Sequence, residues 1–122
     1  ILLARNRARS GFFSLIAGYV EPGEGLEEAF QREALEETGR RVEQVTYWGS
    51  QPWPPSGSLM VGFSAVTGDV RPVCDTDGEL AEVRWVSRTE LPSLTIARKG
   101  SIAHTMIMEW FHGEKTGSVP AR

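Results

Sequence analysis

Cysteine and histidine are scarce in this sequence. Its 122 residues include one cysteine, Cys74, and two histidines, His104 and His112. A single cysteine excludes an internal disulfide and a cysteine-based zinc cluster, so we expect no zinc site within the chain. A lone thiol also fits a reducing compartment, from which we expect a cytoplasmic location. No nucleophile or carboxylate is spaced to meet either histidine, and we interpret both as structural or surface residues.

A strong charge of either sign and long apolar runs are also missing. The 13 basic and 16 acidic residues leave a net charge of −3. This balance predicts no general affinity for nucleic acid or for a membrane surface. No apolar run approaches the length of a membrane-spanning helix, and no signal peptide is visible. We therefore expect no membrane partner.

The remaining composition is typical of one domain with a hydrophobic core. Hydrophobic residues make up 40% of the chain, and the length suffices for one core but not for two. We expect the domain to cover 1–113, and 114–122, which has no periodicity, to be a loose tail. The chain opens on Ile1, inside an apolar run, so we expect that preceding residues are missing or belong to another domain.

Hydrophobic periodicity and turn residues predict two helices and several short, mostly antiparallel strands. The helices are expected over 26–39 and 101–111, the second with its apolar residues on one stripe. Proline cannot join a central ladder, so we predict that the proline-rich stretch 49–58 is a loop of fixed shape. The strands are expected at 1–4, 12–17, 42–48, 59–67, 70–73 and 83–86. Together these elements predict an α/β sandwich.

The stretch 18–39 holds three carboxylates on one face of the first helix. At 100° per residue, Glu33, Glu36 and Glu37 fall on one partly apolar arc. Like charges at this spacing repel by roughly 0.2–0.5 kcal/mol per pair. Arg32 is spaced to pair with Glu36, but one guanidinium cannot neutralise three carboxylates. A hard divalent cation such as Mg²⁺ or Mn²⁺ suits oxygen ligands of this kind. The carboxylates alone leave open the alternative of a solvated, Glu-rich surface.

The spacing of these residues resembles the Nudix box, the signature of hydrolases that cut a nucleoside diphosphate linked to another group. The matching positions are Gly18, Glu24 and the run Arg32-Glu33-Ala34-Leu35-Glu36-Glu37-Thr38-Gly39. The resemblance implies a Nudix-type α/β/α sandwich with a mixed sheet, a loop-helix-loop metal site and a C-terminal helix. Two residues depart from the family pattern, Ala34 and Arg40, and both concern packing rather than ligands.

The resemblance also implies roles for individual residues. Glu79 matches a further family carboxylate outside the box, which completes the metal site or orients the water, and Glu82 is its nearest substitute. The implied catalytic residues are Glu33, Glu36, Glu37 and Glu79. The implied contacts to Mg²⁺ or Mn²⁺ are the same four glutamates and the backbone carbonyl of Ala17. The implied structural supports, which brace the loop against the helix, are Gly18, Glu24, Arg32 and Gly39.

A second resemblance lies in the proline-rich stretch. The run Ser50-Gln51-Pro52-Trp53-Pro54, with Ser58 and Met60 after it, resembles the SQPWPFPxS element that follows the box in NADH pyrophosphatases. The intervening Pro55-Ser56-Gly57 departs from that element. Members of this branch usually carry a four-cysteine zinc ribbon ahead of the domain, and we expect that it was trimmed away or that this member lacks it. The implied substrate-binding residues are Tyr19, Gln51, Trp53, Ser58, Met60 and Ala103.

These resemblances imply hydrolysis of the pyrophosphate bond of NADH, and less well of NAD⁺, to give NMN(H) and AMP. A 5′-NAD-capped RNA offers the same bond, so cap removal is a secondary expectation that the net charge does not support. The alternatives are a Nudix pyrophosphatase for ADP-ribose, dinucleoside polyphosphates or another nucleoside diphosphate derivative, and a non-catalytic Nudix module that binds a nucleotide. The family also implies a homodimer.

Overall fold

The computed structural model describes residues 1–113 and Val119. The expected tail at 114–122 therefore lies almost entirely outside the described residues. The described part is an α/β fold with two α-helices and five strands. In chain order these are β1 (Leu2–Asn6), β2 (Arg9–Ser14), α1 (Leu26–Thr38), β3 (Glu43–Trp53), β4 (Ser58–Val66), β5 (Leu80–Trp85) and α2 (Ile102–His112), with short 3₁₀ turns at Pro54–Ser56 and Leu91–Ser93.

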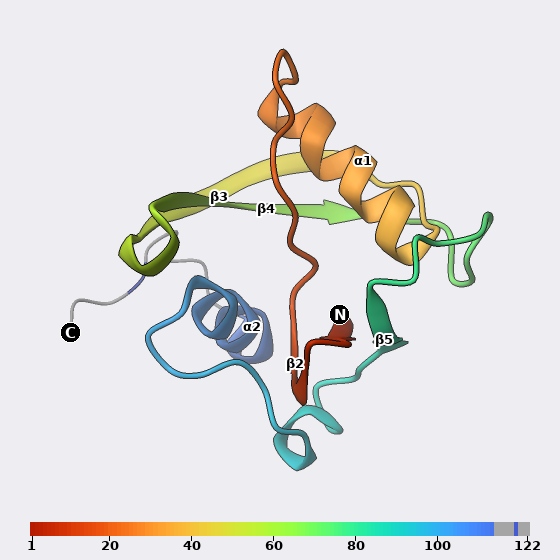
Figure 1. Cartoon of the computed structure of the whole chain (residues 1–122). Coiled ribbons are helices and arrows are strands. Elements are labelled where there is room, and N and C mark those ends of the chain that lie inside the picture. Colours follow the sequence, from red (N-terminus) through yellow and green to blue (C-terminus); the bar gives the residue numbers. More distant parts are fainter. Residues whose placement is uncertain (114–118, 120–122) are drawn as a thin grey trace.

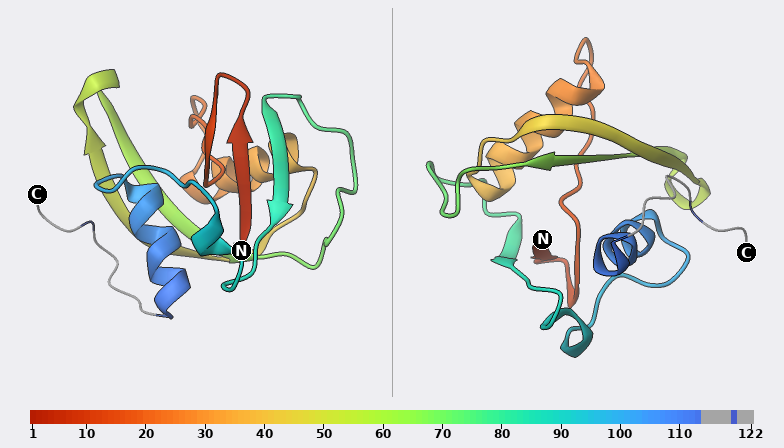
Figure 2. Two further views of the ribbon diagram at one scale, coloured as in Figure 1. Left: turned by 90° about the horizontal axis from the view of Figure 1, so that it is seen from below. Right: turned by 180° about the vertical axis from the view of Figure 1, so that it is seen from behind.

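The strands form two antiparallel sheets. One has the order β2-β1-β5, and the other is the β3–β4 hairpin. A parallel bridge joins Phe13 to Ile96 at the side of the first sheet. The two helices lie on opposite sides of the β3–β4 hairpin (Figure 1), and Figure 2 shows the three strands of the other sheet beside it. This layered arrangement of antiparallel sheets and helices agrees with the predicted fold class.

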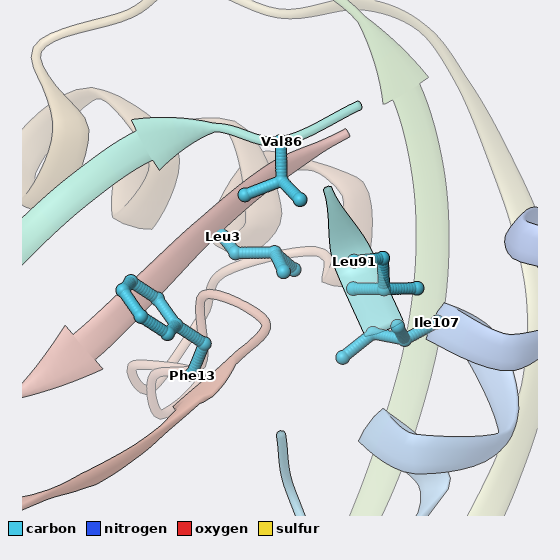
Figure 3. Close-up of a cluster of buried hydrophobic side chains, with 5 residues drawn as sticks. All are labelled: Leu3, Phe13, Val86, Leu91 and Ile107. Atoms are coloured by element: carbon cyan, nitrogen blue, oxygen red, sulfur yellow. The ribbon is translucent and has the colours of Figure 1, made fainter. Parts of the chain in front are cut away.

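The hydrophobic core lies between the three-stranded sheet and α2. Figure 3 shows its buried side chains pointing toward one another: Leu3, Phe13, Val86, Leu91 and Ile107. Helix α2 contributes through the apolar stripe that its periodicity predicts. Burying one such aliphatic side chain stabilises the fold by roughly 1.5–3 kcal/mol. The packing of α2 onto β4 is close, because a Cβ added to Gly62 would lie 2.8 Å from Sδ of Met106.

Helix α1 ends at a left-handed glycine, as predicted. Gly39 has φ +69°, and its N–H donates to the carbonyl of Leu35. A Cβ at this position would lie 2.7 Å from the carbonyl oxygen of Cys74. Glycine is therefore required here both by the backbone conformation and by the segment that passes the end of the helix.

The prediction of a loop over 49–58 is wrong in its first half. Strand β3 continues through Pro52, opposite Leu59, to Trp53, opposite Ser58. The β3–β4 hairpin has only two strands, so each strand has a free edge where proline costs no ladder hydrogen bond. The irregular part shrinks to the turn Pro54–Ser56 and Gly57, whose φ is +66°.

Three predicted strands also differ from those observed. No strand forms at 70–73, because the carbonyl of Val70 accepts hydrogen bonds from the side chains of Arg40 and Trp85 instead of from a ladder. Strand β5 starts at Leu80, three residues before the predicted position. Strand β2 covers Arg9–Ser14 instead of 12–17, which leaves a longer loop before α1.

Arg40, which departs from the family pattern, is almost fully buried. Its guanidinium donates to the backbone carbonyls of Thr38, Asp69 and Val70 at 3.0–3.1 Å. Burial lowers its pKa below the ordinary value, and the nearby carboxylate of Asp69 opposes that shift. The arginine thus replaces an apolar packing contact by hydrogen bonds that hold the segment after β4 against the end of α1.

Candidate metal and substrate site

The loop before α1 is held to the helix by one arginine. Nε and Nη2 of Arg32 donate to the two carboxylate oxygens of Glu24 at 2.7 and 2.9 Å. Nη2 also donates to the carbonyl of Tyr19 at 2.8 Å. These bonds lower the pKa of Glu24, chiefly through the hydrogen bond from Arg32, and raise the pKa of Arg32. Arg32 and Glu24 therefore span the loop and the helix in the arrangement expected of a brace.

The same guanidinium also reaches two of the predicted metal ligands. Nη1 of Arg32 donates to Glu33 at 2.7 Å and to Glu36, one helical turn on, at 3.1 Å. The predicted Arg32–Glu36 pair is thus confirmed. Glu33 is confined from its other side by Gly18, because a Cβ on that glycine would overlap its carboxyl group. The position of Glu33 therefore depends on a glycine in the loop.

Glu37 lies in a different environment, with only 3% of its surface exposed. Its carboxylate lies in a cluster with Asp77 and Glu79, in which one oxygen of each residue lies within 4.8 Å of the others. Burial, followed by the hydrogen bond with Glu79 and the charges of Glu33, Glu79 and Asp77, raises the pKa of Glu37 to about 8. Among the described residues, Oε2 of Glu37 finds no hydrogen-bond donor. One buried carboxylate with an unpaired oxygen, beside the exposed carboxylates of Asp77 and Glu79, fits a hard divalent cation.

Asp77 belongs to this cluster and was not among the predicted site residues. It stands in a short acidic turn, Asp75 to Gly78, that directly precedes Glu79. The N–H of Asp77 donates to the carbonyl of Glu36 at 2.8 Å, and Oδ1 of Asp77 accepts from the N–H of Glu79 at 3.1 Å. The acidic turn was visible in the sequence, but its contact with the end of α1 was not.

Three of the four predicted carboxylates, those of Glu33, Glu36 and Glu79, meet at one cleft with a volume of about 310 Å³, and the buried Glu37 is not among the residues that line it. Tyr19 stands at this cleft with 78% of its surface exposed. Besides Asp77, three of the lining residues were not predicted: Asn6, Arg9 and Glu21. The cleft is lined by Asn6, Arg9, Ala17, Gly18, Tyr19, Glu21, Glu33, Glu36, Asp77 and Glu79.

The other predicted substrate residues lie on the β3–β4 hairpin and α2. Gln51 is opposite Met60, and Trp53 is opposite Ser58, so these four side chains share one face of the hairpin. Gln51 and Trp53 line a separate hollow of about 410 Å³ with three prolines. The two cavities share no lining residue, so within this chain the hairpin residues and the carboxylates do not form one pocket.

Gln51 makes a structural contact that the sequence did not indicate. Its Nε2 donates to the carbonyl of Gly100 at 2.7 Å, and its Oε1 accepts from the N–H of Ile102 at 2.8 Å. The amide therefore holds the first turn of α2, where Ala103 is located. Gln51 therefore fixes the backbone beside Ala103, another of the predicted substrate residues.

Glu82 and the histidines lie outside the carboxylate cluster. Glu82 forms an ion pair with Arg5 at 3.0 Å, which favours Glu79 over Glu82 as the carboxylate beyond the box. Nδ1 of His104 lies 3.0 Å from the carbonyl of Ala97, a contact that links α2 to the preceding loop. This agrees with the interpretation of His104 as a structural residue.

Comparison with known proteins shows the family. The sequence model of the NUDIX domain matches residues 1–111. The chain is 41% identical over 121 residues to the "NAD-capped RNA hydrolase NudC" of Pseudomonas syringae pv. tomato, an alignment that covers 97% of this chain and 41% of the relative. It is 45% identical over 103 residues to the protein of the same name in Mycobacterium bovis, with 84% of this chain and 33% of the relative covered. The chain belongs to the NUDIX family, and the predicted resemblance is confirmed.

This chain spans about two fifths or less of the length of these curated relatives. Among solved structures, a NUDIX hydrolase from Nitrosomonas europaea shares the fold with a TM-score of 0.72 and 24% identity, covering 93% of this chain and 81% of that one. The E. coli ORF135 protein has a TM-score of 0.63 and 26% identity, covering 93% and 79%. Within residues 1–113 and Val119, neither helix combines the length and apolar character that crossing a membrane requires.

Proposed function

We propose that this domain hydrolyses the pyrophosphate bond of NADH, and less well of NAD⁺, with the help of Mg²⁺ or Mn²⁺. The observation that carries the proposal is the buried Glu37, whose unpaired Oε2 lies in a carboxylate cluster at the end of the Nudix helix. A buried carboxylate without a donor is costly for a fold unless a cation balances it. The names of the relatives, which specify NAD-capped RNA, support an NAD-containing substrate.

The metal would be held by carboxylates from α1 and from the loop before β5. Glu37, Asp77 and Glu79 meet within 4.8 Å and form the inner group. Glu33 and Glu36 line the same cleft as Ala17, whose carbonyl is the proposed backbone ligand. The chemistry that the ion supplies when bound is neutralisation of phosphate charge and acidification of water.

The chain itself orients the reacting groups and accepts a proton. Arg32 fixes Glu33 and Glu36, and the turn at Asp77 fixes Glu79. A carboxylate oxygen of Glu79 would take the proton from the attacking water. The oxygen of that water bonds to one phosphorus, the bridging P–O bond breaks, and the bridging oxygen leaves with the other phosphate. Water and NADH thus give reduced NMN and AMP.

Substrate contacts come from two places. The exposed ring of Tyr19 stands at the carboxylate cleft and is available for stacking on a base or nicotinamide. Ser58, Met60 and Trp53 on the hairpin, and Ala103 on α2, are the proposed contacts to the rest of the dinucleotide. Removal of a 5′-NAD cap from RNA uses the same bond and is proposed as a further activity, in line with the relatives' names. A homodimer and a cytoplasmic location stay predictions.

The test is product analysis with a substrate panel. The protein is incubated with Mg²⁺ or Mn²⁺ and NADH, NAD⁺, ADP-ribose, a diadenosine polyphosphate or NAD-capped RNA, and the products are separated by chromatography. We expect NADH to give the highest kcat/KM and Glu36→Gln to lose most turnover. A preference for ADP-ribose or the polyphosphate would replace the proposed substrate. Nucleotide binding without cleavage of any member would make the domain a binding module.

A further inference from the structure

The turn between β1 and β2 places an arginine at the carboxylate cleft. Asn6 and Arg9 are directly opposed across this turn, so their side chains project to the same face. Both residues line the cleft with the carboxylates of Glu33, Asp77 and Glu79. Strand pairing therefore determines that Arg9, rather than Ala8 before it, is presented to the cleft.

The turn is fixed to the loop that carries two of the carboxylates. Nε of Arg7 donates to the carbonyl of Gly78 at 2.6 Å, and the N–H of Arg7 donates to the carbonyl of Glu79 at 3.2 Å. The side chain of Asn6 accepts from the N–H of Ala8 at 2.8 Å, which closes the turn locally. The backbone of Arg9 is thus held at a set position relative to Glu79.

Arg9 differs from the neighbouring arginines in having no partner for its guanidinium. Arg5 is bonded to Glu82, Arg7 to Gly78, and Arg32 to several groups. The side chain of Arg9 forms no hydrogen bond or ion pair with any residue that the structure describes, although carboxylates line the same cleft. Among the described residues that line the cleft, Arg9 is also the only one with a positively charged side chain.

A free guanidinium beside a metal-binding carboxylate cluster has a clear chemical use. Its planar set of donors matches two phosphate oxygens, and its charge persists at every working pH. The carboxylates are matched to the cation, and they repel the two charges of a diphosphate. A positive side chain in the same cleft would attract the diphosphate without competing for the cation.

We propose that Arg9 binds a phosphate of the diphosphate substrate and positions it in the cleft. This inference rests on the proposed function, since it names a residue that holds the substrate of that reaction. Arg9 acts on binding and orientation, and the proton transfer stays with the carboxylates. The contrasting interpretation is an ordinary solvated arginine, which would leave phosphate binding unchanged when it is removed.

Inorganic pyrophosphate is the probe that separates these interpretations. Its affinity in the presence of Mg²⁺ is measured by calorimetry for the parent chain, Arg9→Ala, Arg9→Lys and the control Arg71→Ala. Arg71 is exposed, makes no side-chain bond within the described residues and does not line the cleft, so its removal changes the net charge equally. We expect Arg9→Ala to weaken pyrophosphate binding by about tenfold or more. Arg9→Lys should recover part of the loss, and Arg71→Ala should have no effect.

The Mn²⁺ affinity of Arg9→Ala, measured without pyrophosphate, should not fall as its pyrophosphate affinity does. Removing a positive charge from a carboxylate cleft should leave Mn²⁺ binding unchanged or tighter. Damage to the fold would instead weaken the binding of both Mn²⁺ and pyrophosphate. In that case Arg9→Lys, which keeps the positive charge, tests the role of Arg9 through its pyrophosphate affinity. With NADH as substrate, Arg9→Ala should raise KM much more than it lowers kcat.

The outcomes distinguish the inference from the proposed function. Equal pyrophosphate affinity in the parent and Arg9→Ala would overturn the role of Arg9, even if NADH is cleaved. A second outcome is that Arg9→Ala binds pyrophosphate more weakly than the parent while the parent cleaves none of the panel. This outcome would uphold phosphate binding by Arg9 and overturn the proposed hydrolysis.

Discussion

Replacing Glu37 by glutamine should stabilise the metal-free protein, by an amount that depends on pH. The pKa of Glu37 is raised from 4.5 to about 8 in the fold, chiefly by burial. Between these two pH values, the Glu37 side chain keeps its proton in the folded chain and releases it in the unfolded chain. The stability associated with Glu37 is fully present below pH 4.5 and is lost as the pH rises through about 8.

The magnitude follows from the shift in pKa. One pKa unit corresponds to about 1.4 kcal/mol. At pH 7 the wild-type fold should have lost about 3 kcal/mol relative to acidic conditions through this residue. Glutamine has nearly the same shape and stays neutral, and its NH₂ group can donate to the neighbouring Asp77 or Glu79. Glu37→Gln should therefore exceed the wild type by about 2–3 kcal/mol in the free energy of unfolding at pH 7, and by little at pH 4.5.

The assay is urea unfolding in EDTA at several pH values between 4.5 and 8, for the wild type, Glu37→Gln and the control Glu27→Gln. Glu27 is an exposed acid on the same helix, so its replacement should give a curve parallel to the wild type. Added Mn²⁺ should stabilise the wild type more than Glu37→Gln, because binding to the native state adds to its stability. A constant difference between Glu37→Gln and the wild type across the pH range would refute the reasoning.

Three further substitutions test the remainder of the site. Arg32→Ala removes the bonds to Glu24 and to the carbonyl of Tyr19, and should lower both the Tm and, by about 10- to 100-fold, kcat/KM; a variant that keeps both would make Arg32 a surface residue. Tyr19→Ala should lower kcat/KM for NADH by roughly 10- to 100-fold at unchanged Mn²⁺ affinity, and normal NADH cleavage would argue against stacking. Gly18→Ala should displace Glu33, which would be measured as weaker Mn²⁺ binding with a nearly normal Tm, and unaltered metal affinity would contradict that contact.

The geometry of the box was predictable because its parts are close in sequence. Helical periodicity alone places Arg32 one turn from Glu36, and the observed distance is 3.1 Å. Gly39 as a left-handed cap follows equally from local rules. These predictions need no knowledge of the neighbours that α1 finds in the fold.

The missed features depend on contacts between distant parts of the chain. Whether Pro52 can belong to a strand depends on the number of strands beside it, which its own neighbourhood does not determine. The strand predicted at 70–73 fails because side chains of Arg40 and Trp85 take the Val70 carbonyl. Arg9 lines the same cleft as the carboxylates in a turn that Arg7 bonds to the distant loop at Gly78. Periodicity carries no information on such pairings.

The bond between Gln51 and α2 has a consequence for hydrogen exchange. Amide protons in the first turn of a helix have no acceptor within the helix and generally exchange quickly with solvent. The N–H of Ile102 is in this position, yet it donates to Oε1 of Gln51, and the residue is only 5% exposed. Its exchange therefore requires the bond to Gln51 to break, so this one amide reports on the contact between the two elements that carry the proposed dinucleotide contacts.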